Sequence, residues 1–484
     1  MRITNTMITN GTMRNVNRSK SNLYVTEQQM SSQKKINRPS DDPVVAIRAL
    51  SLRTSLTEIE QYLKKNVPDA ESWMNITETS LNNMDDILSD IYQYCTQGST
   101  DSFTLDNRES IVQCIDQLQK ALYAEGDADY SGRYVFTGYR TDTALTFKNS
   151  FEIDVAYEIN QTFTGDDFTR AMYMKNPVDI SDTNNGVIAA ADTPESEEVY
   201  RLRLAYDKCS ADVAPEVTIG GTAYDVEIMS TEEMEELLST GTLEDNKAYY
   251  VYDKGEIVFS DVTYDALKEE TDIQVKFRKD SFDIGDIRPE HYFDCRDLTN
   301  DVTYTLGKEA QTIDYAINFS QTLKVNTEAN NVLSYDIARD LDDLMKSLQT
   351  VAVVEDKIKK LNDMKESDLY DKATIESMIT AAEKELDYSK NYMESLFAKG
   401  MTQMKDYQAV IATELADLGS REVRLTLTKE RLTQQHTTFS ELKSTNEDVE
   451  LEDIAIDFAA AETVYDAAIA TASKTVRQSL LDYL

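Results

Sequence analysis

The chain has 484 residues, a formal net charge of −39, and only 15 glycines and 7 prolines. So large a negative charge argues against a nucleic-acid partner, because phosphates would be repelled rather than neutralised. With only two histidines, the chain has almost no material for a zinc site or a histidine-based catalytic triad, so we expect no catalytic, metal-binding or cofactor-binding residues. The scarcity of helix breakers favours helix.

The sequence lacks the usual signals for membrane insertion and secretion. No segment approaches the roughly 18 consecutive apolar residues of a membrane span, and residues 1–5 lack the apolar core of a secretory signal. We therefore expect a chain that is cytoplasmic or that leaves the cell by a route that reads no cleaved signal. The four cysteines show no CxxC spacing, and a bridge between Cys209 and Cys295 stays possible.

Residues 1–40 are polar and carry seven basic residues against the single acidic residue Glu27. Their sparse apolar stripe predicts a helix that buries too little to fold alone. Residues 37–43 then form a break. Pro39 cannot continue a helix, Asp42 can cap the next one by accepting a backbone N–H, and Pro43 suits its first position.

A helical rod is predicted to follow from Pro43. Its first helix runs to about Lys65, where Pro68 should kink or interrupt it. The rod then resumes with a seven-residue apolar repeat, and a third helix ends near Gly126, which together predict an antiparallel bundle. We call the core positions of this repeat the rod seam: Met74, Leu81, Met84, Leu88 and Ile91.

Between about 141 and 327 the apolar period changes from helical to two residues. Residues 151–159 and 313–319 alternate apolar and polar side chains, which predicts half-buried antiparallel strands. Gly220-Gly221 and Lys254-Gly255 fit hairpin turns, and Ser230 opens a short helix as a capping box.

Two alternative functions of this middle segment can be weighed from its residues. The acidic pairs Glu232-Glu233 and Glu235-Glu236 could mimic the acid and base of an inserted enzyme, but their adjacent spacing on a capped helix favours a solvated face. The high tyrosine content is compatible with an adhesive or glycan-binding domain, although cross-strand packing of tyrosines explains it better.

Helix returns from about Ser334 and continues almost to the end of the chain. Residues 443–484 hold three basic and nine acidic residues, or −6, against +6 for residues 1–40. Opposite charges, together with the strong apolar seam of the C-terminal helix, predict that these terminal helices pair. The seven-residue repeat of the C-terminal helix defines what we call the assembly seam: Leu451, Ile454, Phe458, Ala461, Tyr465, Ala468 and Ala472.

These elements predict a mainly α fold, with paired terminal helices and a long antiparallel helical rod, into which a β-rich domain is inserted. The layout is nested. We expect a terminal domain from residues 1–40 with 443–484, a rod domain from 41–140 with 328–442, and an outer β-rich domain from 141–327.

Several short motifs resemble the flagellin family of bacterial axial proteins, in particular its members that join the flagellar hook to the filament. They lie in the break at 37–43, in the turn at 132–138, and in the closing segments 444–449 and 479–484. The positions that carry the resemblance most clearly are Pro39, Ser40, Asp41, Asp42, Pro43, Gly132, Arg133 and Gly138. Flagellin itself is the alternative within the family.

The resemblance implies a structural protein without enzymatic activity, found outside the cell in the flagellum and exported without a cleaved signal peptide. The terminal helices would bundle axially in an inner tube and the β-rich domain would lie at the surface. The implied partners are the hook-side junction protein (hook-associated protein 1), flagellin, an export chaperone and the flagellar secretion apparatus. The resemblance further implies a homo-oligomeric ring.

Overall fold

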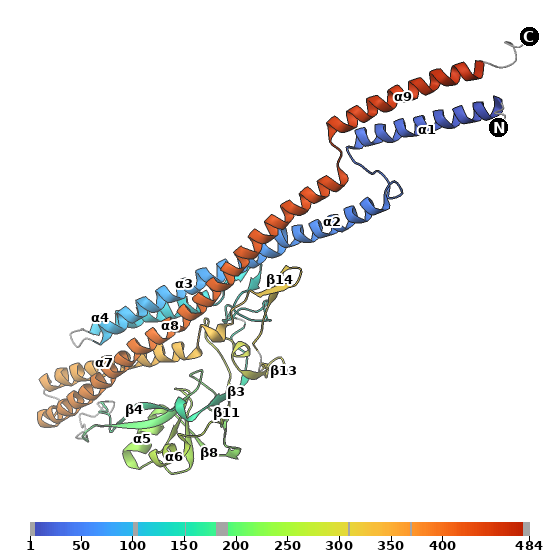
Figure 1. Ribbon diagram of the computed structural model, residues 1–484. Helices are drawn as coiled ribbons and strands as arrows, with labels where there is room; N and C mark the ends of the chain where they lie inside the picture. Colours follow the sequence, from blue (N-terminus) through green and yellow to red (C-terminus); the bar gives the residue numbers. More distant parts are fainter. Residues whose placement is uncertain are drawn as a thin grey trace, which may run out of the picture. The chain divides into compact units, whose positions relative to one another are not determined.

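The computed structural model describes residues 5–99, 105–150, 152–180, 192–307, 310–367 and 370–477. It confirms the predicted fold class, because helices flank a region that contains the larger sheets (Figure 1). The chain divides into two compact units. The first unit comprises Met1–Glu71, Tyr315–Leu323 and Val423–Leu484, and the second comprises Ser72–Asp314 and Lys324–Glu422.

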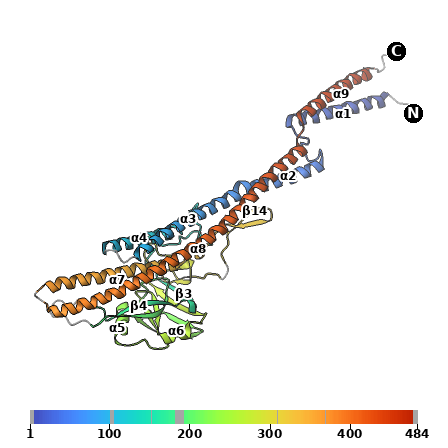
Figure 2. The same cartoon turned by 60° about the vertical axis from the view of Figure 1, so that its left-hand side comes forward.

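The first unit contains two pairs of helices. Helix α1 (Asn5–Ser32) lies beside α9 (Leu451–Arg477), and the two run antiparallel in both views (Figures 1 and 2). Helix α2 (Pro43–Gln61) pairs with the end of α8 (Lys372–Glu447), where Nδ2 of Asn446 donates to the carbonyl of Val45 at 3.1 Å. The hairpin of β14 (Asp314–Asn318) and β15 (Gln321–Lys324) lies largely in this unit.

The helix that begins at Pro43 does not end near Lys65. It passes through a π-helical turn, Tyr62–Asn66, directly into α3 (Val67–Gly98). Pro68 has no backbone N–H and its ring crowds the preceding turn, so a wider turn there avoids a break. The N–H of Val67 accordingly donates to the carbonyl of Tyr62, five residues earlier.

The helices of the second unit bury the rod seam. Besides most of α3, they are α4 (Leu105–Glu125), α7 (Tyr335–Glu366) and the first part of α8. Gly98 ends α3 where Phe397 of α8 approaches; a Cβ at Gly98 would lie 2.4 Å from the Phe397 ring. All five rod-seam side chains are fully buried: Met74, Leu81, Met84, Leu88 and Ile91.

Two sheets, one mixed and one antiparallel, form the β-rich part of the second unit. One has the order β4-β5-β10-β9-β8, in which only β8 and β9 pair in parallel, because α5 (Thr231–Thr240) crosses between them. Its strands are β4 (Thr169–Lys175), β5 (Glu195–Arg203), β8 (Asp225–Met229), β9 (Lys247–Val251) and β10 (Glu256–Phe259). Met234 and Leu238 of α5 pack on Tyr173 and Tyr249 of this sheet.

The second sheet is antiparallel and has the order β13-β12-β3-β11-β6-β7. Its strands are β3 (Tyr157–Phe163), β6 (Glu216–Ile219), β7 (Thr222–Ala223), β11 (Ile273–Lys279), β12 (Asp294–Asp297) and β13 (Val302–Tyr304). A short helix α6 (Asp261–Leu267) and a two-stranded hairpin of β1 (Asp129–Tyr130) and β2 (Arg133–Tyr134) complete the named elements.

The local predictions for this region are mostly confirmed. Gly220 and Gly221, with φ of +54° and +80°, join β6 to β7, and Ser230 forms the predicted capping box with Glu233. The strand predicted from residue 151 was wrong at its start: β3 begins only at Tyr157, residues 152–154 form a turn and bends, and residue 151 lies outside the described residues.

All four cysteines are free thiols, so Cys209 and Cys295 are not bridged. Among the helices of the described ranges, none combines the length and apolar character needed to cross a membrane.

Candidate assembly surface

The assembly seam lies on the side of α9 that is least exposed. Ile454 is 2% exposed. The other six residues of the assembly seam are half-buried except Leu451, which is 57% exposed. The half-buried positions are Phe458, Ala461, Tyr465, Ala468 and Ala472. Nearly all other α9 positions with described side chains are exposed. Because α1 is the helix that lies alongside α9, the seam is the face turned toward α1.

The α1–α9 pair buries little apolar surface. On α9 only Ile454 is buried, and no described side chain of α1 is. Alanine contributes little area, and burial free energy scales with apolar area. Isolated helices need such burial to persist in water. The pair is therefore weakly held by its own contacts.

Both helices also leave large apolar side chains uncovered. Each of those on α1 and α9 is more than 40% exposed: Met7, Ile8, Met13, Tyr24, Val25, Met30, Leu451, Ile456, Val464 and Ile469. The α2–α8 pair of the same unit adds Val44, Ile47, Leu50, Val423, Leu427 and Leu442. Exposed apolar residues are normal one at a time, but a concentration on slender helix pairs marks a surface of association.

The linkers between the two helix pairs are tied to each other. Lys34 and Asp448 form an isolated β-bridge, and the N–H of Val449 donates to the carbonyl of Gln33 at 3.1 Å. Arg53 of α2 makes a two-pronged contact with Glu447, Nε to Oε1 at 2.8 Å and Nη2 to Oε2 at 2.6 Å. This contact holds the pKa of Glu447 below its ordinary value.

The motif at 37–43 shapes the entry into α2. Asp41 Oδ2 accepts the N–H of Arg38 at 2.8 Å, which closes the turn. Asp42 Oδ1 accepts the N–H groups of Val44 and Val45 at 2.9 and 3.2 Å, and Pro43 occupies the first helical position. These are the contacts of an N-cap. Pro39, Ser40 and Asp41 are exposed.

The motif at 132–138 belongs to the second unit. Gly132, with φ of +77°, lies in the β1–β2 turn, and its N–H donates to Oδ2 of Asp129 at 3.1 Å. The Arg133 guanidinium lies 5.1 Å from the Trp73 ring, a cation–π distance. Gly138 also has a positive φ, +59°.

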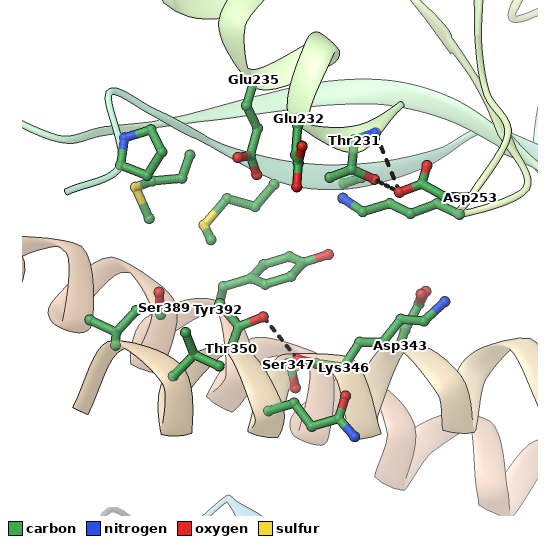
Figure 3. Close-up of a pocket in the computed structure, with 18 of the residues that line it drawn as sticks. Thr231, Glu232, Glu235, Asp253, Asp343, Lys346, Ser347, Thr350, Ser389 and Tyr392 are labelled. Atoms are coloured by element: carbon green, nitrogen blue, oxygen red, sulfur yellow. Dashed lines mark hydrogen bonds between the residues drawn. The ribbon is translucent and has the colours of Figure 1, made fainter. Parts of the chain in front are cut away.

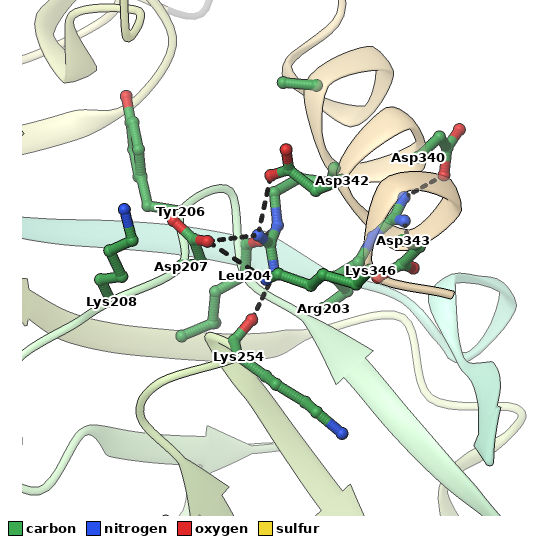
Figure 4. Close-up of polar contacts among 12 residues, drawn as sticks. Arg203, Leu204, Tyr206, Asp207, Lys208, Lys254, Asp340, Asp342, Asp343 and Lys346 are labelled. Carbon is green, nitrogen blue, oxygen red and sulfur yellow. Dashed lines mark hydrogen bonds and ion pairs between the residues drawn. The ribbon is translucent and has the colours of Figure 1, made fainter. Parts of the chain in front are cut away.

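Sequence reasoning missed a buried polar network between β5 and α7. Arg203 donates to Asp340 at 2.6 Å and to Asp343 at 3.1 Å (Figure 4). Arg201 donates to the same Asp343 and to Glu256, which is fully buried. Burial alone would raise the pKa of Asp343, but Arg201 and Arg203 hold it well below its ordinary value.

A third arginine extends this network in the opposite direction. Arg339 of α7 donates to the carbonyls of Leu204, at 3.1 Å, and Lys254. Lys346 of α7 donates to Asp207 at 3.2 Å. Arginines of β5 therefore donate to carboxylates of α7, and basic side chains of α7 donate to acceptors on the sheet side. The spacing of Arg201 and Arg203 on one strand face, and of Asp340 and Asp343 on one helix face, was the available signal in the sequence.

Within the described part of the chain, no group of three or more histidine, cysteine, aspartate or glutamate side chains is arranged to hold a metal ion.

Comparison with known proteins bears on the N-terminal part of the chain. Residues 3–141 match the family model of the bacterial flagellin N-terminal helical region. Flagellar hook-associated protein 3 of Escherichia coli is 28% identical over 145 residues, which are 30% of this chain and 45% of that protein. The protein of the same name from Salmonella typhimurium is 25% identical over 145 residues, with the same shares. The chain thus spans about half the length of the curated relatives it matches.

A crystal structure of flagellar hook-associated protein 3 from Legionella pneumophila is 10% identical, with 81% of this chain and 97% of that chain covered at a TM-score of 0.33. Residues 3–141 are thus similar to the N-terminal helical region of bacterial flagellins, and 145 residues of the chain are similar in sequence to flagellar hook-associated protein 3.

Proposed function

We propose that this chain is a structural junction subunit of the bacterial flagellum. It would connect the hook, through the hook-side junction protein, to the flagellin filament by axial bundling of its terminal helices. The flagellin N-terminal region and the relatives named hook-associated protein 3 support this class of function. The observation that carries the proposal is the uncovered apolar surface of the α1–α9 pair.

Assembly would complete the burial that the single chain lacks. In a ring of subunits, the exposed apolar side chains of α1 and α9 would be covered by neighbouring helices. The basic residues 1–40 and the acidic residues 443–484 would favour contacts between unlike helices and oppose contacts between like ones. Folding of these helices would thus be coupled to assembly.

The three expected domains take distinct roles in this proposal. Residues 1–40 with 443–484 would form the inner tube, residues 41–140 with 328–442 the rod outside it, and residues 141–327 the outer surface. The chain would be exported unfolded by the flagellar secretion apparatus with an export chaperone, which needs no cleaved signal. The protein would then act outside the cell and without enzymatic activity.

Deletion of the gene in its own host tests the junction role. The mutant should build hooks but no filaments, and it should release unpolymerised flagellin into the medium, because the first flagellin layer would have no template. Expression of the intact chain in the mutant should restore filaments and serves as the control.

Two outcomes would contradict the proposal. Normal filaments on the deletion strain would exclude a required junction role. Absence of flagellin from both filament and medium, with flagellin restored by the chain itself, would identify the chain as the filament subunit instead.

A further inference from the structure

The acidic face of α5 is only partly the solvated face that the sequence predicts. Glu232, Glu233 and Glu236 are exposed, but Glu235 is half-buried. It lines a cavity of about 710 Å³ inside the second unit, between the five-stranded sheet with α5 and the helices α7 and α8. Figure 3 shows Glu235 on the sheet side of this cavity and Lys346 on the helix side. Charges of both signs therefore line the cavity, so it favours a ligand of neither charge.

The dipeptide Asn10-Gly11 lies inside α1 of the first unit, and the fold does not explain its glycine. Gly11 has an ordinary helical backbone, and a Cβ at this position would meet no described atom within 4 Å. Glycine is the least favourable residue of a helix interior after proline. The glycine therefore weakens α1 without a gain in packing within the described part of the chain.

An asparagine before a glycine can lose its side-chain amide without an enzyme. The backbone nitrogen of Gly11 attacks Cγ of Asn10, and the new N–Cγ bond closes a succinimide ring. The Cγ–Nδ2 bond breaks, and ammonia leaves with the proton of the Gly11 N–H. Glycine favours this attack because it has no Cβ and adopts many backbone conformations.

Water then opens the succinimide at one of its two carbonyl carbons. Attack at Cγ yields aspartate, whereas attack at the main-chain carbonyl carbon of residue 10 yields isoaspartate. The backbone of isoaspartate runs through the side chain and is one methylene longer. Both products carry a carboxylate, which is ionised at pH 7. The net change is the loss of ammonia and the gain of water.

An intact α-helix blocks the first step. The N–H of residue 11 is bonded to the carbonyl four residues earlier, so its nitrogen is held away from the Asn10 side chain. The reaction therefore needs α1 to open locally. Asn10 is exposed and no described side chain of α1 is buried, so this opening costs little. A slow reaction of a transiently open segment follows the population of the open form.

We propose that Asn10 deamidates spontaneously in the free chain, and that this reaction limits how long a free chain stays competent to assemble. The second half of the proposal rests on the proposed function. The new carboxylate lies in residues 1–40, whose charge of +6 complements the −6 of residues 443–484. The extra methylene of isoaspartate also interrupts the regular hydrogen bonds of the helix. Both changes weaken the α1–α9 pair.

Peptide mass spectrometry of the full chain, incubated at mildly alkaline pH, tests the deamidation. The peptide that contains Asn10 should exchange ammonia for water over time. A parallel incubation in urea that unfolds the whole chain gives the rate of the fully open dipeptide. The rate at Asn10 in the folded chain should lie within about tenfold of the rate in urea, because weakly packed segments open at almost no cost. A larger protection than this would overturn the proposal.

Asn83→Gly is the matched control, because it places the same dipeptide at the exposed Asn82 of α3. Helix α3 buries the whole rod seam, so its opening approaches global unfolding. In the folded variant Asn82 should react at least about a hundredfold more slowly than Asn10, and in urea at about the same rate. Similar rates in the folded variant would overturn the role of α1. Circular dichroism checks that the variant folds, and the urea comparison at Asn10 decides without it.

Gly11→Ala tests the consequence for assembly, because its Cβ hinders the attack and meets no described atom within 4 Å. Purified hooks of the deletion strain are mixed with fresh or aged chain, and electron microscopy measures incorporation. Aged unmodified chain should incorporate less in proportion to its conversion at Asn10, whereas aged Gly11→Ala should match its fresh form. Equal incorporation of fresh and aged unmodified chain would overturn this consequence. Failure of the fresh chain would overturn it together with the proposed function, whereas the mass spectra would still decide the deamidation.

Discussion

Arg201 and Arg203 are two residues apart on β5, so their side chains lie on the same face of the strand. Both contact carboxylates of α7. Removal of water from such charges is costly, and the cost is offset only while each charge keeps its partners. Arg201 is 5% exposed and serves both Glu256 and Asp343. Individual residues of this network therefore decide whether the sheet stays docked on the helix.

Replacement of Arg201 by methionine should destabilise the second unit strongly. It leaves Glu256 and Asp343 without their shared cation, which costs about 3–5 kcal/mol when a buried pair is broken. Arg170→Met on the neighbouring strand β4 is the control, because Arg170 pairs with the exposed Glu198 and should lose less than about 1 kcal/mol. Urea unfolding followed by near-ultraviolet circular dichroism measures the free energy of unfolding of both variants. If both lost the same amount, water would reach the network.

Asp286 makes stability depend on pH in the opposite sense to Asp343. Burial raises the pKa of Asp286 from 3.8 to about 6. Between these values the folded state binds more protons than the unfolded state, so stability falls as pH rises. For Asp343 the lowered pKa has the reverse effect: its stabilisation is present above its unfolded pKa and is lost as pH falls.

Asp286→Asn should therefore stabilise the protein at pH 7, by at most about 3 kcal/mol. The gain should shrink as pH falls from about 6 and vanish below about 4, because the aspartate is then protonated in both states. Asp265→Asn is the control, since Asp265 is exposed and pairs with Lys268 at the surface. Thermal unfolding across pH measures the difference; a gain that does not depend on pH would contradict the assignment.

At the scale of elements, the helices differ in how much of their stability comes from contacts within the single chain. Helix α3 buries the whole rod seam, whereas the α1–α9 pair buries only Ile454 fully among its described side chains. Local stability follows buried apolar contact. Amide hydrogen exchange should accordingly be slow in α3 and close to the unprotected limit in α1 and α9 of the free chain.

Ala468→Asp tests the proposed role of the assembly seam. Ala468 is half-buried on the side of α9 that faces α1. The melting temperature of the free chain should stay almost unchanged, because the pair contributes little. Incorporation at the hook tip should be lost, since assembly would enclose the α1–α9 seam and an unpaired charge buried there costs several kcal/mol.

Ala467→Asp places the same charge on the exposed side of α9 and controls for the effect of the charge on the stability of the free chain. If Ala468→Asp lowered the stability of the free chain by more than about 1 kcal/mol relative to this control, the helix would already be firmly docked before assembly. Electron microscopy of purified hooks with the two variants measures incorporation.

At the scale of the whole molecule, the β-rich part is an insertion between two helical segments of the chain. The Arg140 guanidinium lies 4.3 Å from the centroid of the Tyr304 ring, so the two ends of this insertion lie close together. It contacts α7 mainly through Arg339, Asp340 and Asp343, which water could solvate after its removal, and Val178 also packs on Leu361 of α7. The hairpin β14–β15 lies beyond Tyr304 and largely in the first unit.

Replacement of residues 141–303 by a short Gly-Ser linker should therefore leave the helices folded. Insertions with adjacent ends at the surface are tolerated best, and so is their removal. Helical circular dichroism at 222 nm and a cooperative melting transition measure the outcome, with the intact chain as control. Loss of the cooperative transition would mean that the sheets are part of the core of the helical rod.

Features set by near neighbours in the chain could be read from the sequence. The rod seam follows from the period of α3, the cap at Asp42 from a short side chain before Pro43, and the β6–β7 turn from two adjacent glycines. In each case the cause lies within a few residues or one helical repeat. The same reasoning placed the seam of α9 on one face, although its function in assembly stays a prediction.

Only the tertiary structure decided what depends on distant partners. The π-helical turn before Pro68 reflects how a long helix accommodates a missing N–H without ending. The pairing of Arg203 with Asp340, and the placement of Glu235 beside a cavity, join segments more than 100 residues apart. Spacing along the chain puts Arg203 and Asp340 each on one face of its element, but their burial and their partners are set by packing between elements, which the sequence does not show.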